Sequence, residues 1–303
     1  MKICTLCPRS CAVDREKGER GICGQTEALK VARAALHYWE EPCISGTEGS
    51  GAVFFSGCSL HCVFCQNHNI ANGTAGKEIT VERLAEIFLE LQEKKANNIN
   101  LVTPGHFVPQ IVTALERAKG QGLTIPIVYN TSSYENVDTI KKLEGLVDIY
   151  LPDFKYMSPE LSKNYSHAAD YGVVAKAAIA EMVRQTGAAE FEGGGADPVE
   201  EGRLMRRGTI VRHLLLPGCT EDSKAVIRYL YETYGNRIYI SIMNQFTPLE
   251  GLKAYPELNR RITEAEYDEV VDYAIDLGVE CGFIQEGDTA EESFIPEFDG
   301  EGV

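Results

Sequence analysis

The sequence has few positive charges for its length. Its 303 residues contain 29 Lys and Arg but 45 Asp and Glu, which gives a formal net charge of −16. Proteins that bind nucleic acids use basic patches, because neutralising the phosphates releases counterions. The acidic balance therefore argues against a nucleic-acid partner.

Long apolar runs are missing as well. No stretch approaches the roughly 18 consecutive apolar residues of a membrane-spanning helix, so we expect no membrane partner. The opening sequence MKICTLCPRSCAVDR has neither the apolar region nor the cleavage site of a secretory signal. We therefore expect a cytoplasmic protein, and the chain length fits one large domain such as an all-parallel barrel.

Cysteine, in contrast, is plentiful, with ten residues. In a reducing compartment cysteines seldom form disulfides, so metal binding or catalysis is the first interpretation. Residues 1–30 form a Cys-rich head with little apolar patterning, and we expect a bound metal to supply its missing folding energy. The four cysteines of the head are Cys4, Cys7, Cys11 and Cys23. Their thiolates would close a tetrahedral zinc site or saturate an iron–sulfur cluster, and the spacing favours neither metal centre.

From residue 51 onward, short apolar segments alternate with longer amphipathic ones. Strands are expected at 51–57, 99–103, 125–130, 147–155, 208–218, 237–246 and 280–286. Helices are expected at 80–95, with Thr80 as the N-cap, and at 108–122, 136–145, 171–186, 221–235 and 263–278. Strands that alternate with helices in this way run parallel, with the helical crossovers on the outside.

This alternation predicts an α/β fold, a partial or open (β/α)6 barrel of the TIM type, over residues 51–290. The Cys-rich head, 1–30, would precede the barrel, and an acidic, loosely packed tail, 291–303, would follow it. Residues 188–207 interrupt the alternation and are expected to form an exposed insertion. In such barrels the reactive groups lie at the carboxyl ends of the strands.

The strongest chemical signal lies in the loop directly after the first expected strand. Cys58, Cys62 and Cys65 form a C-x3-C-x2-C set, and three thiolates in one loop can surround a soft metal centre. Three ligands are one short of the four that normally saturate an iron–sulfur cube, so one iron would stay open to a substrate or cofactor. The structural alternatives are a zinc site completed by His61 or His68, and buried thiols without a ligand.

Polar residues also occur where later strands end. Gly105 would allow a close backbone approach, and His106 is a hydrogen-bond partner, a proton relay or simply the start of a helix. Asp153 and Lys155 are two residues apart, so they share one face of a strand. Arg212 and Asn244 are polar residues inside expected barrel strands. A cofactor would provide hydrogen-bond partners for them, although each could equally be a structural group with partners in the protein.

The Cys motif, with an aromatic residue before its last cysteine, resembles the radical S-adenosylmethionine (SAM) superfamily. More narrowly, the chain resembles the pyruvate formate-lyase activating enzyme-like group of glycyl-radical-enzyme activases. The stretches that carry the resemblance cover most of residues 51–246. They are GAVFFSGCSLHCVFCQN, INLVTPGHFVPQI, IPIVYNTSSYE, LVDIYLPDFKYM and VRHLLLPGC.

The resemblance implies a [4Fe–4S] cluster held by Cys58, Cys62 and Cys65, with SAM on the open iron. Reductive cleavage of SAM would yield a 5′-deoxyadenosyl radical that abstracts hydrogen from a glycine of a partner glycyl radical enzyme. A flavodoxin- or ferredoxin-type reductant would supply the electron. The alternatives are a radical SAM enzyme acting on another peptide or a small molecule, an iron–sulfur electron carrier, and a zinc-dependent interaction module.

The resemblance also implies roles for individual side chains. Phe64 would shield the cluster and lie near the adenine, and Lys155 would pair with the methionyl carboxylate of SAM. Asp153 would orient Lys155, or bind a monovalent cation together with Asn130 and Thr131. The chain departs from the activase pattern, which has an acid in the stretch around Gly105 and His106, an Asp at Asn130 and, in some members, a His near Asn244.

Overall fold

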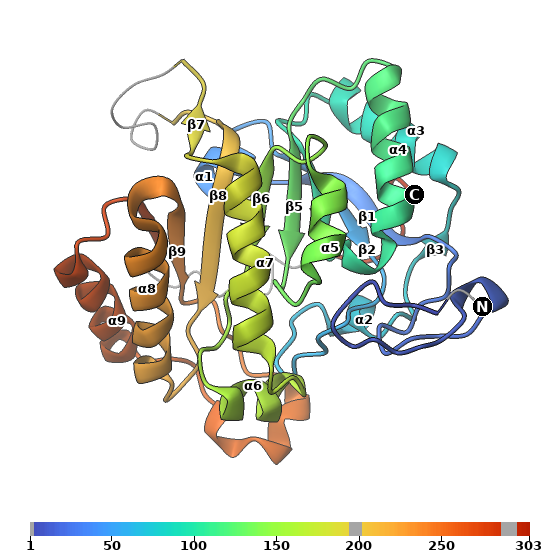
Figure 1. Cartoon of the computed structure of the whole chain (residues 1–303). Coiled ribbons are helices and arrows are strands. Elements are labelled where there is room, and N and C mark those ends of the chain that lie inside the picture. Colours follow the sequence, from blue (N-terminus) through green and yellow to red (C-terminus); the bar gives the residue numbers. More distant parts are fainter. Residues whose placement is uncertain (1–2, 194–201, 286–295) are drawn as a thin grey trace.

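The computed structural model describes residues 3–193, 202–285 and 296–303 (Figure 1). Its strands are β1 (Lys30–His37), β2 (Ser50–Phe55), β3 (Lys77–Glu78), β4 (Ile99–Val102), β5 (Ile127–Thr131), β6 (Ile149–Pro152), β7 (Glu190–Phe191), β8 (Met205–Leu214), β9 (Tyr239–Met243) and β10 (Gly282–Ile284). Its α-helices are α1 (Pro42–Ser45), α2 (His68–Ala71), α3 (Val81–Glu93), α4 (Val108–Gly120), α5 (Val137–Ile140), α6 (Pro159–Ser166), α7 (Tyr171–Thr186), α8 (Thr220–Tyr234) and α9 (Glu264–Leu277).

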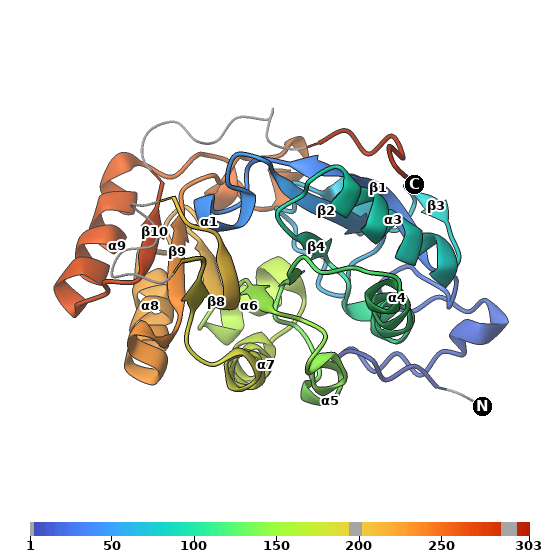
Figure 2. The same ribbon diagram turned by 90° about the horizontal axis from the view of Figure 1, so that it is seen from above.

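The strands form one curved sheet in the order β10-β9-β8-β6-β5-β4-β2-β1-β3, with β7 attached to β8. Neighbouring strands from β2 to β10 along this path run parallel, whereas β1 is antiparallel to β2 and to β3. Figure 2 shows the sheet as an open arch with α4, α5, α7 and α8 along its outer side. The expected α/β class with a mostly parallel, unclosed sheet is confirmed, and a partial barrel is consistent with it.

The pattern of apolar residues explains why these elements form. Strands β2, β4, β5, β6 and β9 are buried along their whole length, as expected for parallel strands covered on both faces. Helix α3 begins as expected at Thr80, whose side chain accepts a hydrogen bond from the Arg83 amide. Its apolar stripe then packs into the core beside β2 and β4: Leu84, Ala85, Ile87, Phe88 and Leu91.

Several element boundaries differ from the sequence expectation. The strand expected at 147–155 leaves the sheet after Pro152, apart from a single bridge between Asp153 and Arg212. The helix expected at 136–145 is only α5 followed by a short 3-10 turn, while the helix expected at 171–186 is confirmed as α7. Part of the insertion expected at 188–207 forms β7, and residues 194–201 lie outside the described residues.

The acidic tail is bound to β1 rather than loosely packed over the part that is described, 296–303. The Ala34 amide donates to the Glu301 carbonyl, and the Gly300 amide donates to the Ala32 carbonyl. Arg33 also pairs with the carboxylates of Asp299 and Glu301. These contacts use backbone groups of β1 beyond Lys30 and Val31, the two residues that pair with β3.

Residues 3–29 pack against the carboxyl edge of the sheet, beside α2 in Figure 1. Thr139 donates a hydrogen bond to the Leu6 carbonyl, and Arg15 donates to the His106 carbonyl at 2.6 Å. Only one short 3-10 turn, Arg15–Lys17, is regular here, and few apolar side chains are buried. Among the residues that the structure describes, no helix is long and apolar enough to cross a membrane.

Candidate active site

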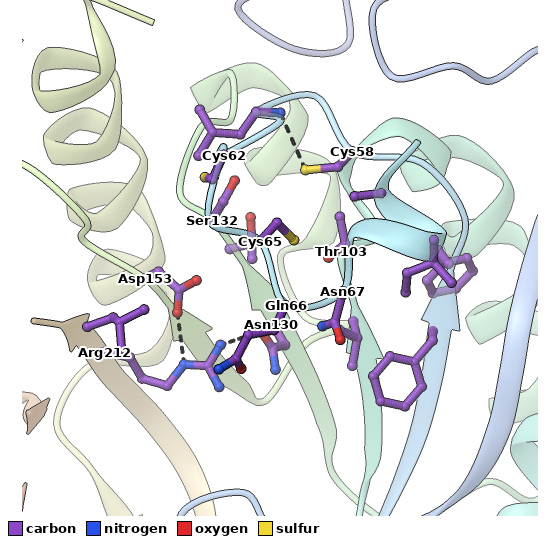
Figure 3. Close-up of a pocket in the computed structure, with 18 of the residues that line it drawn as sticks. Cys58, Cys62, Cys65, Gln66, Asn67, Thr103, Asn130, Ser132, Asp153 and Arg212 are labelled. Carbon is purple, nitrogen blue, oxygen red and sulfur yellow. Dashed lines mark hydrogen bonds and ion pairs between the residues drawn. The ribbon is translucent and has the colours of Figure 1, made fainter. Parts of the chain in front are cut away.

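The three motif cysteines lie together in the loop that follows β2. Cys58, Cys62 and Cys65 line a cavity of about 260 Å³ at the carboxyl ends of the parallel strands (Figure 3). Their thiols are free, and burial raises the pKa of Cys62, with repulsion from Cys58 adding to the effect. We call residues 57–67 the cysteine loop.

The surroundings of these thiols suit a positively charged metal centre. Burial raises the pKa of Cys65 to about 12, with repulsion from Cys58 and Cys62 adding to the effect. Nearby donors already point at two of the sulfurs: the Leu60 amide lies 3.4 Å from Cys58 Sγ, and the Ser166 hydroxyl lies 3.1 Å from Cys62 Sγ. The Cys62 and Cys65 thiols therefore need a bound cation to become thiolates, and hydrogen-bond donors to Cys58 and Cys62 are in place to stabilise thiolate charge.

Within the described ranges, no three His, Cys, Asp or Glu side chains form a group that could hold a metal ion in the arrangement present. A [4Fe–4S] cube attaches each cysteine to a different iron, so its ligands need not surround a single point. The set of three soft thiol donors in one loop, open to a cavity, thus fits a cluster with one iron left for another ligand.

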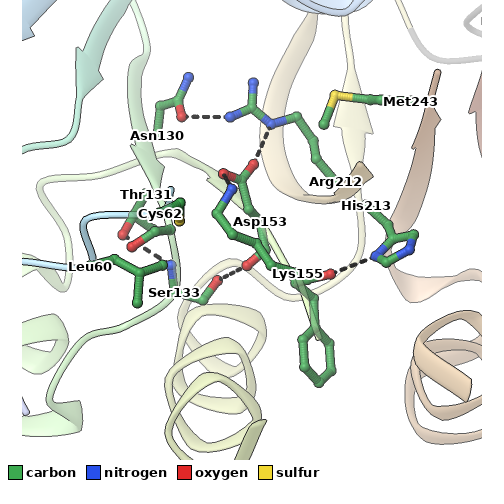
Figure 4. Close-up of polar contacts among 12 residues, drawn as sticks. Leu60, Cys62, Asn130, Thr131, Ser133, Asp153, Lys155, Arg212, His213 and Met243 are labelled. Carbon is green, nitrogen blue, oxygen red and sulfur yellow. Dashed lines mark hydrogen bonds and ion pairs between the residues drawn. The ribbon is translucent and has the colours of Figure 1, made fainter. Parts of the chain in front are cut away.

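Across the cavity, Asp153 accepts hydrogen bonds from two cations (Figure 4). Lys155 Nζ lies 2.8 Å from Asp153 Oδ2, and Arg212 Nε lies 2.9 Å from Asp153 Oδ1. Burial alone would raise the pKa of Asp153, but the two cations outweigh it and hold that pKa below its usual value. Burial lowers the pKa of Lys155, but the Asp153 carboxylate beside it raises that pKa above its usual value. Both side chains are therefore charged.

Arg212 has all three of its guanidinium nitrogens paired inside the chain. Besides Asp153, it donates to Glu40 at 3.0 Å and to the Asn130 side-chain oxygen at 2.7 Å. Glu40 also accepts hydrogen bonds from the side-chain amides of Asn100 and Asn130. Arg212 and Asn130 thus line the cavity as parts of an internal network. Of the two alternatives for Asp153, orienting Lys155 or binding a monovalent cation, its contact with Lys155 is consistent with the first.

Three other candidates lie outside the described cavity lining. His106 is buried behind the cysteine loop, where a ring nitrogen lies 2.6 Å from the Ser56 carbonyl, and burial lowers its pKa to about 4. Gly105 adjoins the Glu135 carboxylate so closely that a side chain there would collide with it. Asn244 pairs with Gln285 beyond β9. Phe64 does line the cavity, packed between Tyr156 and Phe246.

Sequence reasoning missed several cavity residues. Glu40 follows β1, a strand that was not expected, and its role depends on pairing across the sheet. Trp39 stands at the rim of the cavity with 60% of its surface exposed. Gln66 and Gln245 join the cysteine loop to the end of β9, through a 2.8 Å hydrogen bond from the Gln66 side chain.

Comparison with known proteins identifies the class of this site. Residues 52–182 match the Radical SAM superfamily, and this range includes the cysteine loop, Asp153 and Lys155. This match supports membership of the radical SAM superfamily. That family implies a [4Fe–4S] cluster and SAM as cofactors, and the match supports a radical SAM enzyme.

Individual relatives extend the likeness over different parts of the chain. An uncharacterized protein of Methanocaldococcus jannaschii is 28% identical over 286 residues, which cover 90% of this chain and 74% of that protein. The pyruvate formate-lyase-activating enzyme of Clostridium pasteurianum is 29% identical over 114 residues, 36% of this chain and 46% of that enzyme. The crystal structure of Streptococcus suis SuiB bound to precursor peptide SuiA is 11% identical, covers 76% of this chain and 46% of its own, and has a TM-score of 0.48. The chain thus spans about half the length of the last two.

The buried network around Arg212 makes a stability prediction. Replacing Arg212 with Met should lower the free energy of unfolding by about 3 kcal/mol, because Glu40 and Asp153 would each lose a buried counter-charge. Arg117→Met removes an exposed ion pair with Glu82 and should change that free energy by less than about 1 kcal/mol. Denaturant titration of both variants tests this. Equal effects would mean that the network is not a major source of stability.

Proposed function

We propose that this protein activates a glycyl radical enzyme by abstracting a hydrogen atom from a glycine of that partner. The observation that carries the proposal is the set of three cysteines facing a paired Asp153 and Lys155 across one cavity. The partial likeness to a pyruvate formate-lyase-activating enzyme supports the choice of substrate class. The exposed Trp39 at the cavity rim also favours a protein or peptide substrate, because aromatic side chains are frequent at protein interfaces. We place the enzyme in the cytoplasm, with a flavodoxin- or ferredoxin-type reductant.

In this proposal Cys58, Cys62 and Cys65 hold the [4Fe–4S] cluster. When bound, the cluster and SAM together supply the 5′-deoxyadenosyl radical chemistry. The chain's own residues bind and orient these two cofactors. Lys155 donates one of its three N–H groups to Asp153, and the other two can donate to the methionyl carboxylate of SAM. Phe64 covers the cavity wall and excludes water.

Cleavage of SAM tests the cluster assignment. After anaerobic iron–sulfur reconstitution, the protein should release 5′-deoxyadenosine when dithionite and SAM are added. Cys62→Ala should abolish the release, because two thiolates do not hold the cluster in place. Cys281→Ser, at a cysteine outside the cavity lining, is the matched control and should retain activity. Full activity of Cys62→Ala would refute its assignment.

The partner is tested separately. Incubation of the reconstituted protein, SAM and reductant with a pyruvate formate-lyase should produce the electron paramagnetic resonance (EPR) signal of a glycyl radical. Release of 5′-deoxyadenosine without that signal would favour the second candidate, a radical SAM enzyme acting on another peptide or a small molecule. If a cluster-loaded protein formed neither 5′-deoxyadenosine nor the glycyl radical, the enzymatic proposal as a whole would be overturned.

Lys155 gives a binding prediction. Lys155→Ala should raise the dissociation constant of SAM by about tenfold or more, because a charge-assisted hydrogen bond contributes roughly 1.5–3 kcal/mol. Lys155→Arg keeps the charge and should bind more tightly than the Ala variant. Equilibrium dialysis with the reconstituted protein measures both. An unchanged constant in Lys155→Ala would remove this residue from the SAM site.

We further propose a second metal centre, zinc or iron–sulfur, in the head. Cys4 and Cys11 interact electrostatically with Cys23, and the Ile22 amide donates to Cys11 Sγ at 3.2 Å. Burial raises the pKa of Cys7 to about 12, with Glu135 and the other thiols adding to it. The buried thiols of Cys7 and Cys23 therefore stay protonated unless a cation binds, and the head has few apolar side chains to hold it together otherwise.

Metal analysis tests the head directly. The double variant Cys4→Ala, Cys7→Ala should lose one zinc, or about four irons, per chain relative to the unaltered protein. The Cys281→Ser variant should keep the full content. An unchanged metal content in the double variant would exclude a metal at the head and would leave the cysteine loop unaffected.

A further inference from the structure

The cysteine loop is held from outside by the end of α6. The Val63 amide donates to the Tyr165 carbonyl at 2.9 Å, which joins the two segments by their backbones. One residue further on, the Ser166 hydroxyl reaches Cys62 Sγ at 3.1 Å. Ser166 is completely buried, so water does not compete for this hydrogen bond.

The chemistry of the groups determines the direction of this contact. A thiolate only accepts hydrogen bonds, so Ser166 must donate its proton toward a Cys62 thiolate. The Ser166 oxygen is then left to accept from Tyr156, whose hydroxyl lies 2.9 Å away and is also buried. Tyr156, Ser166 and Cys62 therefore form a chain of donors that ends on one sulfur, and each bond in it polarises the next.

Arg9, from the head, fixes the position of Ser166. Its guanidinium donates to the Ser166 carbonyl at 2.9 Å and to the Ser59 carbonyl, in the cysteine loop, at 2.8 Å. It also donates to the carbonyls of Leu60 and His167, on the same two segments. A single planar cation thus ties the end of α6 to the cysteine loop and sets the spacing between hydroxyl and sulfur.

We infer that Ser166 is a positioning residue for the cluster, whose hydrogen bond to the Cys62 sulfur makes the cluster easier to reduce. The inference rests on the proposed function, since it requires the cluster at Cys62. Reduction adds negative charge that spreads onto the thiolate sulfurs, and a donor aimed at a sulfur stabilises the reduced state more than the oxidised one. The enzyme would use this bond to bring the cluster within range of a cellular electron donor.

The test is a redox titration of the reconstituted full chain, followed by EPR of the reduced cluster. Ser166→Ala should shift the midpoint potential to a more negative value, whereas Ser166→Thr, which keeps a hydroxyl, should restore it toward the starting value. Tyr156→Phe should shift it in the same direction by less. Ser162→Ala is the matched control, because Ser162 lies buried in the same helix but bonds to the Pro159 carbonyl, and it should leave the potential unchanged.

The outcomes separate this inference from the proposal beneath it. A cluster with the same potential in the Ser166→Ala and Tyr156→Phe variants would overturn the role of Ser166 and leave the proposed function intact. If Ser166→Ala did not retain a cluster, an unshifted Tyr156→Phe would still overturn it. Absence of any cluster in the unaltered chain would overturn both the role of Ser166 and the proposed function. A shift as large in Ser162→Ala as in Ser166→Ala would show a general loosening of α6 and would also count against it.

Discussion

The site depends on one buried cation, the guanidinium of Arg212. A charge inside an open parallel sheet must be compensated, and here the compensation comes from Asp153, Glu40 and Asn130. These partners stand on or after β6, β1 and β5, so a single side chain joins segments far apart in sequence. The same network leaves Asp153 placed to hold Lys155 at the cavity, opposite the cysteine loop.

The cysteine loop is also held in place by a distant segment, the Cys-rich head. Burial raises the pKa of Cys62 and Cys65, so these two thiols stay protonated unless a cation binds. The head reaches the loop at two points, through Arg9 and through the 2.7 Å contact between the His61 ring and the Ile22 carbonyl. A segment that has little core of its own therefore positions the loop that carries Cys58, Cys62 and Cys65.

Sequence reasoning succeeded where the signal is local. The alternation of apolar strands with amphipathic helices predicted the parallel order, and the Thr80 cap and α7 lie where they were expected. It missed β1, whose Ala-rich sequence is a weak strand former and is held in place by pairing with β2. It also missed α6, although Ser158 and Pro159 are a recognisable helix start.

The order of residues along the chain determined the soft donor set, Cys58, Cys62 and Cys65, because ligands within one loop are brought together by spacing alone. Only the tertiary structure decided what faces them. Glu40, Ser166 and Arg9 reach the site across 172, 104 and 50 positions from Arg212, Cys62 and Ser59. Contacts over such separations depend on how strands and loops pack, and no local pattern of residue types encodes that packing.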